Sequence, residues 1–336
     1  MRIIRFTVIR VALFVPVALG VVIFTFFAIR VLPGDPVQAF ASPTSTQRDL
    51  EAIRERLGLA KSLPSQFLDY MSGLWRGDLG TSIQSGTPVT VEISTRLGPT
   101  LELVFLGVFV ALILSIILGF WAALRNNRPF DQVSRVGSLV GTALPEFWLA
   151  LIAIVIGYSW LGIFPGPSGR IGLGMAPTPI TGAEAVDALI TGNFQSLASA
   201  LWYLALPVLV IAIGASAALF RNVRTSALEV MAAQPYAAAQ AHGIYGWRLV
   251  RGYLLRGTLS KTPTLVALIF GAVLGTVVLI EVVFSWQGSG QWLLRGLLYR
   301  DYPVVQAGVM IIALIYAAAY LVADVVHAAL DPRVRL

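Results

Sequence analysis

The chain has 336 residues, of which 57% are hydrophobic and 12% are charged, and it has no cysteine. Soluble domains carry about 25% charged residues, so the composition indicates an integral membrane protein, and the lack of cysteine excludes disulfides, thiolate catalysis and Cys-based metal sites. The excess of 24 Lys and Arg over 17 Asp and Glu does not indicate nucleic-acid binding, because the basic residues flank apolar segments.

Six apolar segments are long enough to cross a bilayer, since a spanning helix needs about 20 apolar residues. They are predicted at residues 11–29, 100–124, 136–161, 202–220, 265–284 and 304–326. The first is interpreted as an uncleaved helix, because its apolar stretch is long and no small-residue cleavage site follows. We therefore expect an all-α integral membrane protein with six transmembrane helices.

The distribution of basic residues predicts the orientation of these helices. The two shorter loops on one side hold only Arg170, Arg295 and Arg300, whereas the termini and the other loops are rich in arginine. Basic residues favour the cytoplasmic side. We therefore expect a multi-pass protein with both termini in the cytoplasm.

The long outer segment at residues 31–98 is predicted to form a small extracytoplasmic helical subdomain. Residues 47–57 have helical periodicity with paired charges, residues 64–75 are typical of a second helix, and glycines then favour turns. The predicted organisation is a first transmembrane helix at 1–30, this subdomain, and a membrane domain at 99–330. The outer region at 164–198 is rich in Gly and Pro and is expected to be irregular.

Four carboxylates fall within the predicted spans, namely Glu102, Glu146, Glu281 and Asp324. Such residues are functional candidates, because burying a charge in a membrane is unfavourable. The first and last lie near span ends, which favours structural roles. Glu146 follows Pro145, and a helix break beside a carboxylate can line a pathway. Glu146, Trp148 and Glu281 are therefore pathway candidates, although a structural role stays equally open for both glutamates.

Nothing in the sequence indicates nucleotide hydrolysis by the chain itself. A phosphate-binding loop needs Gly-Lys followed by Ser or Thr, but Lys61 follows alanine and Lys261 follows serine. A secondary carrier is a weaker alternative, because neither an inverted repeat nor a carboxylate relay is apparent. An intramembrane enzyme is also disfavoured, since His242 and His327 belong to no catalytic or metal-binding pattern. We expect no cofactor and no metal site.

The connector at residues 221–261 is the most informative segment. Pro235 favours a helix start, an alanine-rich stretch follows, and Gly243 is placed to end the helix in the left-handed conformation. Tyr236 and Gln240 are four residues apart and are expected to share a face. Small side chains allow close approach of another protein. An interfacial helix on anionic lipid would explain the arginines at 248–256 but not the alanine-rich turn.

Residues 236–243, Tyr-Ala-Ala-Ala-Gln-Ala-His-Gly, resemble the EAA loop of bacterial ATP-binding cassette (ABC) importer permeases, especially the dipeptide/oligopeptide branch. Other motifs match this branch in chain order. They are Leu-Pro-Gly-Asp-Pro at 32–36, Arg-Gly-Asp-Leu-Gly at 76–80, Thr-Leu-Glu-Leu at 100–103, Leu-Pro-Glu-Phe-Trp at 144–148, Glu-Val-Val-Phe-Ser-Trp at 281–286, Arg-Asp-Tyr-Pro-Val-Val-Gln at 300–306 and Asp-Pro-Arg at 331–333. Each motif alone is weak, and their common order makes the resemblance specific.

Two positions depart from the family pattern. Ala237 stands where many members have glutamate, although the peptide branch commonly lacks it as well. Before the fifth span, Asn-Ala-Leu-Leu-Pro is usual, whereas this chain has Gly-Thr-Leu-Ser-Lys-Thr-Pro at 257–263. The geometry between Lys261 and Pro263 is therefore left open.

The resemblance implies a type I ABC importer transmembrane domain in a bacterial inner membrane, which forms half of a pathway for peptides. It also implies a second permease, two ATP-binding subunits and an extracytoplasmic solute-binding protein. The implied coupling helix, on which an ATP-binding subunit docks, comprises Tyr236, Ala237, Ala238, Ala239, Gln240, Ala241 and Gly243. Other members of the branch carry nickel or sugars, so these cargoes remain alternatives.

Overall fold

The computed structural model describes residues 2–31, 37, 46–56, 58–260 and 262–330. The family motifs at 32–36 and 331–333, and Lys261 of the junction left open above, lie outside these residues. The helices, in chain order, are α1 (Arg2–Val31), α2 (Gln47–Arg56), α3 (Leu63–Trp75), α4 (Val89–Leu124), α5 (Pro129–Ala143), α6 (Glu146–Ile154), the π-helical η2 (Val155–Trp160), α7 (Glu184–Ile190), α8 (Phe194–Ala232), α9 (Gln234–Ala241), α10 (Gly246–Leu249), the π-helical η3 (Val250–Leu255), α11 (Arg256–Leu259), α12 (Pro263–Val283), α13 (Ser289–Leu298) and α14 (Tyr302–Leu330).

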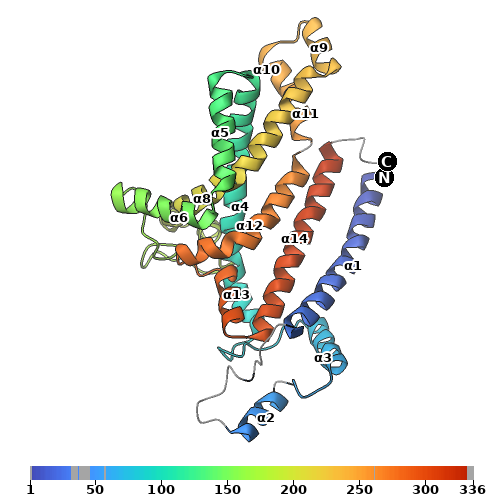
Figure 1. The fold of residues 1–336 in the computed structure, drawn as a ribbon, viewed down its shortest axis with the longest axis vertical. Helices are drawn as coiled ribbons and strands as arrows, with labels where there is room; N and C mark the ends of the chain where they lie inside the picture. Colours follow the sequence, from blue (N-terminus) through green and yellow to red (C-terminus); the bar gives the residue numbers. More distant parts are fainter. Residues whose placement is uncertain (1, 32–36, 38–45, 57, 261, 331–336) are drawn as a thin grey trace.

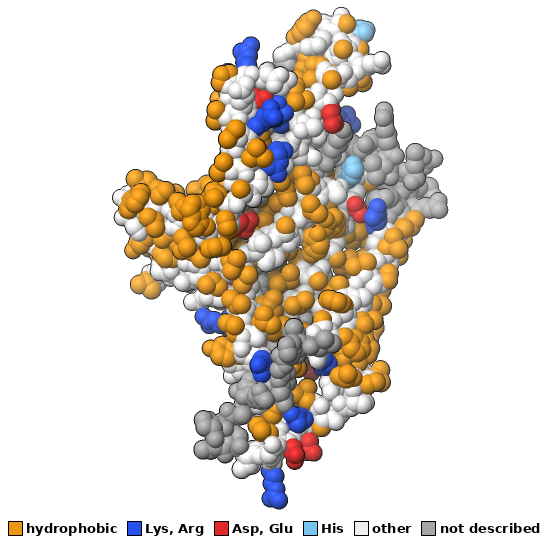
Figure 2. All heavy atoms as spheres, in the orientation of Figure 1, with side chains coloured by type: hydrophobic (Ala, Val, Ile, Leu, Met, Phe, Trp, Pro, Cys, Tyr) orange, Lys and Arg blue, Asp and Glu red, His pale blue; other side chains and the backbone are white. Residues whose placement is uncertain are grey.

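The long helices pack side by side into an elongated bundle (Figure 1). The most extensive helix pair is α4 with α8, while α12 packs against α4 and α14, and α1 packs mainly along α14. Five helices are long and apolar enough to cross a membrane, and the bent pair α5–α6 makes a sixth if it counts as one span. Hydrophobic side chains cover much of the visible surface between the two ends of the molecule (Figure 2). The expected all-α membrane architecture is confirmed.

Two glycines of α4 explain its close contact with α8. A Cβ atom at Gly107 would lie 2.5 Å from the side chain of Ile211, and one at Gly119 would lie 2.8 Å from that of Val223. Small residues at membrane-helix interfaces let backbones approach closely, so van der Waals packing can hold the pair together. The main apolar core, which includes Leu103 and Ile211, forms along this contact.

The predicted third span is not one continuous helix. Its first part is α5, and its second part runs from the start of α6 to the end of η2. The two parts meet at a bend of 103°, and α6 projects sideways from the bundle (Figure 1). Leu144 has an extended ψ of 130° and Pro145 one of 134°. Proline lacks an N–H and disfavours helical backbone in the residue before it, so the helix ends before this pair and restarts at Glu146.

Outside the membrane spans, the helices predicted at 47–57 and 64–75 are confirmed by α2 and α3. Two short helices were not predicted. One is α7, within the region expected to be irregular, and the other is α13, between α12 and α14. The turn before α7 is organised by the buried Asp187, which accepts hydrogen bonds from the backbone amides of residues 180–182 and from the hydroxyl of Thr181. Sequence periodicity does not reveal such a turn.

Candidate functional site

The connector after α8 folds as a short helical hairpin at one end of the bundle (Figure 1). The extended Ala233 separates α8 from α9, and Pro235 occupies the first turn of α9. At the other end, Gly243 has a φ of 80°. The amide of Gly243 donates to the carbonyl of Gln240, and the amide of Ile244 to that of Ala239, each at 3.0 Å. This is a Schellman cap, and it confirms the helix and the helix end predicted from the sequence.

The two sides of α9 have different surroundings. Tyr236 is 8% exposed, and with Ala239 it belongs to a buried cluster. The other buried members are Phe120 and Ala123 of α4, Val223 and Ala227 of α8, Leu249 of α10 and Leu254 of η3. Gln240, four residues further along α9, is exposed and does not belong to this buried cluster. Tyr236 fastens α9 to the bundle.

The opposite side of α9 is exposed and has small side chains. Its exposed members among the predicted docking residues are Ala237, Ala238, Gln240, Ala241 and Gly243. Because alanine and glycine have no long side chains, another protein can approach this backbone closely. In α10, η3 and α11, which follow α9, the arginines at 248, 251 and 256 are exposed as well. The exposed side of α9 therefore offers a surface of small side chains, and the arginines at 248, 251 and 256 offer a basic surface beside it.

A buried ion pair ties the first turn of α5 to α8, near the hairpin. Arg224 donates from Nε to Oδ1 of Asp131 at 2.5 Å and from Nη2 to Oδ2 at 2.7 Å. Its Nη2 also reaches Oδ1 of Asn126, and the amide of Asn127 donates to the same aspartate. Sequence reasoning missed this pair, because its members are 93 residues apart and no local pattern connects them.

Glu146 lies at the first position of α6, directly after the bend. Its Oε2 accepts a hydrogen bond from the hydroxyl of Thr276 on α12 at 2.8 Å. A Cβ at Gly214 on α8 would lie 3.2 Å from Oε1, so glycine leaves room for the carboxylate there. Glu146 thus joins three helices while staying partly exposed, and Trp148 is 45% exposed.

Glu281 is completely buried, at 0% exposure. Its Oε1 accepts a hydrogen bond from the hydroxyl of Thr100, and its Oε2 accepts one from the amide of Gln291 at 2.7 Å. The hydroxyl oxygen of Thr100 in turn accepts from the amide and the hydroxyl of Ser289. This carboxylate therefore joins α12, α4 and α13. It has no exposed surface in this conformation, which favours the structural alternative that the sequence left open for Glu281.

The other two carboxylates of the predicted spans are also engaged in contacts between helices. Oε1 of Glu102 accepts hydrogen bonds from the amides of Ala185 and Val186 at the start of α7. Asp324 of α14 pairs with Arg10 of α1, and the two charged groups are 2.8 Å apart. Both arrangements agree with the structural roles that their positions near span ends favour.

Comparison with known proteins adds family evidence to this geometry. Residues 115–336 match the family described as binding-protein-dependent transport system inner membrane component. Residues 3–104 match the corresponding N-terminal family. The two matches together cover most of the chain, including both the hairpin and the outer segment.

Three relatives illustrate the similarity. A probable D,D-dipeptide transport system permease of Escherichia coli K12 is 36% identical over 319 residues, which cover 95% of this chain and 94% of that protein. A di/tripeptide transport system permease of Pseudomonas aeruginosa is 35% identical, and the match covers 97% of each chain. A dipeptide transport system permease of Escherichia coli K12 is 32% identical over 98% of each chain.

Proposed function

Because the chain belongs to the family of binding-protein-dependent transport system inner membrane components, we propose that the cargo it helps to move is a small peptide. The chain is a non-catalytic, multi-pass inner-membrane permease subunit of an ATP-driven importer. The peptide proposal is supported by the relatives described above, whose names specify dipeptides or tripeptides and which match this chain over nearly their full length. Nickel or a sugar would be the alternative cargo.

The observation that carries the mechanism is the exposed small-residue side of α9, which its buried side holds against α8 and α4. We propose that an ATP-binding subunit docks on this exposed side. The family implies ATP-binding and substrate-binding partners. In our proposal, two ATP-binding subunits act on two coupling helices, one from this chain and one from a second, homologous permease subunit that completes the pathway.

The proposed orientation places α9 and both termini in the cytoplasm. It is supported by the arginine-rich connector. The start of α1 and the end of α14 also lie towards the same end of the bundle as α9 (Figure 1). The outer segment, residues 31–98, then faces the extracytoplasmic side, where it serves as a cap or as a contact for the solute-binding protein.

Movement of α9 would reach the membrane helices through two connections. The buried cluster around Tyr236 joins α9 to α8 and α4. The Asp131–Arg224 pair joins α8 to the start of α5. Because such packed contacts are stiff, we propose that closure of the ATP-binding subunits shifts α8 and α5 together and alternates access to the pathway. Glu146 and Trp148, beside the bend, are the pathway candidates, and Glu281 keeps the outer ends of its helices together.

Docking is tested by adding a charged side chain to the exposed side of α9. Ala238→Glu and Ala241→Glu should abolish co-purification of the chain with its ATP-binding subunit, because a carboxylate would be buried without a partner in the interface. Ala60→Glu, at an exposed alanine beyond the opposite end of the bundle, is the matched control. Normal co-purification and normal transport in both α9 variants would refute docking on this side.

Cargo is tested by ATP-dependent uptake into proteoliposomes that hold the complete transporter with its solute-binding protein. We expect uptake of a labelled dipeptide, no uptake of nickel or a disaccharide, and no uptake of any cargo without ATP. Uptake of nickel or the disaccharide in place of the dipeptide would reject the peptide proposal while leaving the permease function intact.

A further inference from the structure

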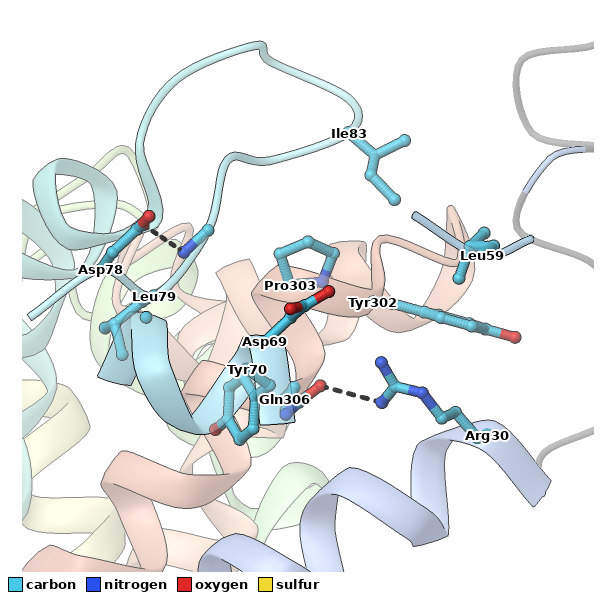
Figure 3. Close-up of a pocket in the computed structure, with 12 residues that line it drawn as sticks. Arg30, Leu59, Asp69, Tyr70, Asp78, Leu79, Ile83, Tyr302, Pro303 and Gln306 are labelled. Atoms are coloured by element: carbon cyan, nitrogen blue, oxygen red, sulfur yellow. Dashed lines mark hydrogen bonds between the residues drawn. The ribbon is translucent and has the colours of Figure 1, made fainter. Parts of the chain in front are cut away.

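A cavity of about 220 Å³ lies where α1, α3 and α14 meet, at the opposite end of the bundle from α9. Figure 3 shows its lining residues, which come from these three helices and from the loops at residues 59 and 78–83. A water molecule occupies about 30 Å³ in the liquid, so the cavity has room for a small organic molecule. The family motifs at residues 76–80 and 300–306 contribute to its lining. No step of the transport mechanism above uses it.

One wall of the cavity has an unused hydrogen-bond donor. Gln306 of α14 is 5% exposed. Its Oε1 accepts from Nη1 of Arg30 at 3.3 Å. Its Nε2 makes no well-formed hydrogen bond among the residues that the structure describes, and only a weak contact with the hydroxyl of Tyr70. Buried amide groups nearly always have partners, because leaving one unpaired in a dry environment is unfavourable. The Nε2 group therefore calls for an acceptor.

The neighbouring cation has only neutral partners. Arg30 donates to the carbonyl of Phe26 and to the side-chain oxygens of Gln66 and Gln306. Its guanidinium also lies 3.5 Å from the centre of the Phe26 ring. Within the described part of the chain, no carboxylate pairs with Arg30 and its Nη2 makes no hydrogen bond. A guanidinium presents five donors in a fork that matches a carboxylate, so a negative group completes this wall.

Two carboxylates near the mouth give the cavity a second chemical preference. Asp69 pairs with Lys61 at 2.6 Å, and Asp78 accepts a hydrogen bond from the amide of Gly80 at 2.8 Å. These partners keep them from neutralising Arg30. Asp69 belongs to α3 and Arg30 to α1 (Figure 3). The charge of Asp69 is balanced by Lys61, whereas Asp78 has only a neutral amide as its partner. The carboxylate of Asp78 repels a doubly charged anion such as phosphate and attracts an ammonium group.

We propose that this cavity binds a small zwitterion such as a dipeptide, with its carboxylate held by Arg30 and Nε2 of Gln306. Its ammonium group then faces the carboxylates of Asp69 and Asp78. The proposal stands on the cavity itself. It needs no ATP-binding subunit, so its failure and the failure of the transport function are separate results.

The experiment uses the full-length chain in nanodiscs of a neutral lipid and measures binding of glycylglycine by calorimetry. We expect saturable binding in the millimolar range or tighter. Glycylglycine amide, which lacks the carboxylate, should bind at least about tenfold more weakly, because the charge-assisted hydrogen bonds to Arg30 are lost. Absence of glycylglycine binding, equal binding of the amide, or tighter binding of inorganic phosphate would each overturn the proposal.

Gln306→Glu separates the cavity from any other peptide site on the chain. The new carboxylate keeps an oxygen beside Arg30 and supplies its missing counter-charge, so the fold is retained while the donor and the free positive charge are removed. We expect binding to fall at least about tenfold with no loss of thermal stability. The matched control is Gln84→Glu, at an exposed glutamine outside the cavity. Unchanged binding in Gln306→Glu would show that the peptide sits elsewhere and would refute the assignment.

Discussion

Glu281 and Glu146 stand in similar apolar surroundings in the sequence, but their side chains have different environments in the fold. Glu281 accepts hydrogen bonds from two other parts of the chain and is fully buried, whereas Glu146 stays partly exposed beside Thr276. The sequence shows that both carboxylates lie in apolar segments. It cannot show the donors, because Thr100 is 181 residues from Glu281 and Thr276 is 130 residues from Glu146.

This difference predicts unequal effects of removing the two carboxylates. Glu281→Ala should lower the free energy of unfolding by at least about 1–3 kcal/mol, because the hydroxyl of Thr100 and the amide of Gln291 lose their acceptor in a buried site. Glu146→Ala should have a smaller effect, since neither Glu146 nor its donor Thr276 is buried. Thermal unfolding in detergent measures both. Equal losses in the two variants would contradict the structural role of Glu281.

Asp187 predicts a dependence of stability on pH in the outer region. Burial raises the pKa of its carboxyl, but hydrogen bonds from Thr181 and from the amides of Ile180, Thr181 and Gly182 outweigh this effect and lower the pKa below the usual value. A lowered native pKa means that the ionised carboxylate stabilises the fold above the unfolded-state pKa of about 3.9. This contribution is lost as the pH falls further, through the native pKa.

Asp187→Asn tests this dependence. The variant should be less stable than the natural chain at neutral pH, because its amide cannot accept all of these hydrogen bonds. The difference in melting temperature between the two proteins should then shrink as the pH is lowered from about 6 to about 3. A difference that stays constant across this window would show that the ionised form of Asp187 contributes no stability to the fold.

At the scale of helices, hydropathy located the membrane segments well but not the full helices. The spans predicted at 100–124 and 202–220 are the apolar parts of α4 and α8, which run from Val89 to Leu124 and from Phe194 to Ala232. Apolarity reports where lipid surrounds a helix, whereas a helix ends only at a breaker or cap. Pro145 predicted a break, but the direction of α6 depends on contacts such as Glu146 with Thr276, which no local pattern reveals.

The α4–α8 contact predicts opposite effects for two glycine substitutions. Gly107→Ala should destabilise the chain by about 1–3 kcal/mol, because the new methyl group meets Ile211. Gly137→Ala, in α5, should be neutral or slightly stabilising, since nothing lies within 4 Å of the added carbon. Thermal unfolding compares the two. Adding Ile211→Ala should restore part of the stability lost in Gly107→Ala, and failure of this rescue would show that the clash is not the cause.

At the scale of the whole molecule, α8 is the element that links the two ends. With 39 residues and a rise of 1.5 Å per residue, it extends roughly 58 Å. Its last turns contact α9 and its middle packs on α4, so a displacement at the hairpin reaches the core through one continuous helix. The sequence predicted the hairpin and the spans, but not the Asp131–Arg224 pair that fastens α5 to the same helix.

Breaking the Asp131–Arg224 ion pair should uncouple transport from ATP hydrolysis. In Arg224→Met, the complete transporter should transport less cargo per ATP hydrolysed, because α5 no longer follows α8, and assembly with the ATP-binding subunit should persist. Exchanging the charges, Asp131→Arg with Arg224→Asp, should restore part of the coupling. Parallel assays of uptake and phosphate release measure the ratio. An unchanged ratio in Arg224→Met would exclude a coupling role for the ion pair.

The packing of α1 along α14 has a consequence for how the chain is made. Arg30 and Gln306, which join these helices, are 276 residues apart. A ribosome adds about 5–20 residues per second, so the first helix enters the bilayer on the order of tens of seconds before its principal neighbour is synthesised. During biogenesis, α1 must therefore remain in the lipid as a single inserted helix. The last helix to emerge is the one that incorporates the first into the bundle.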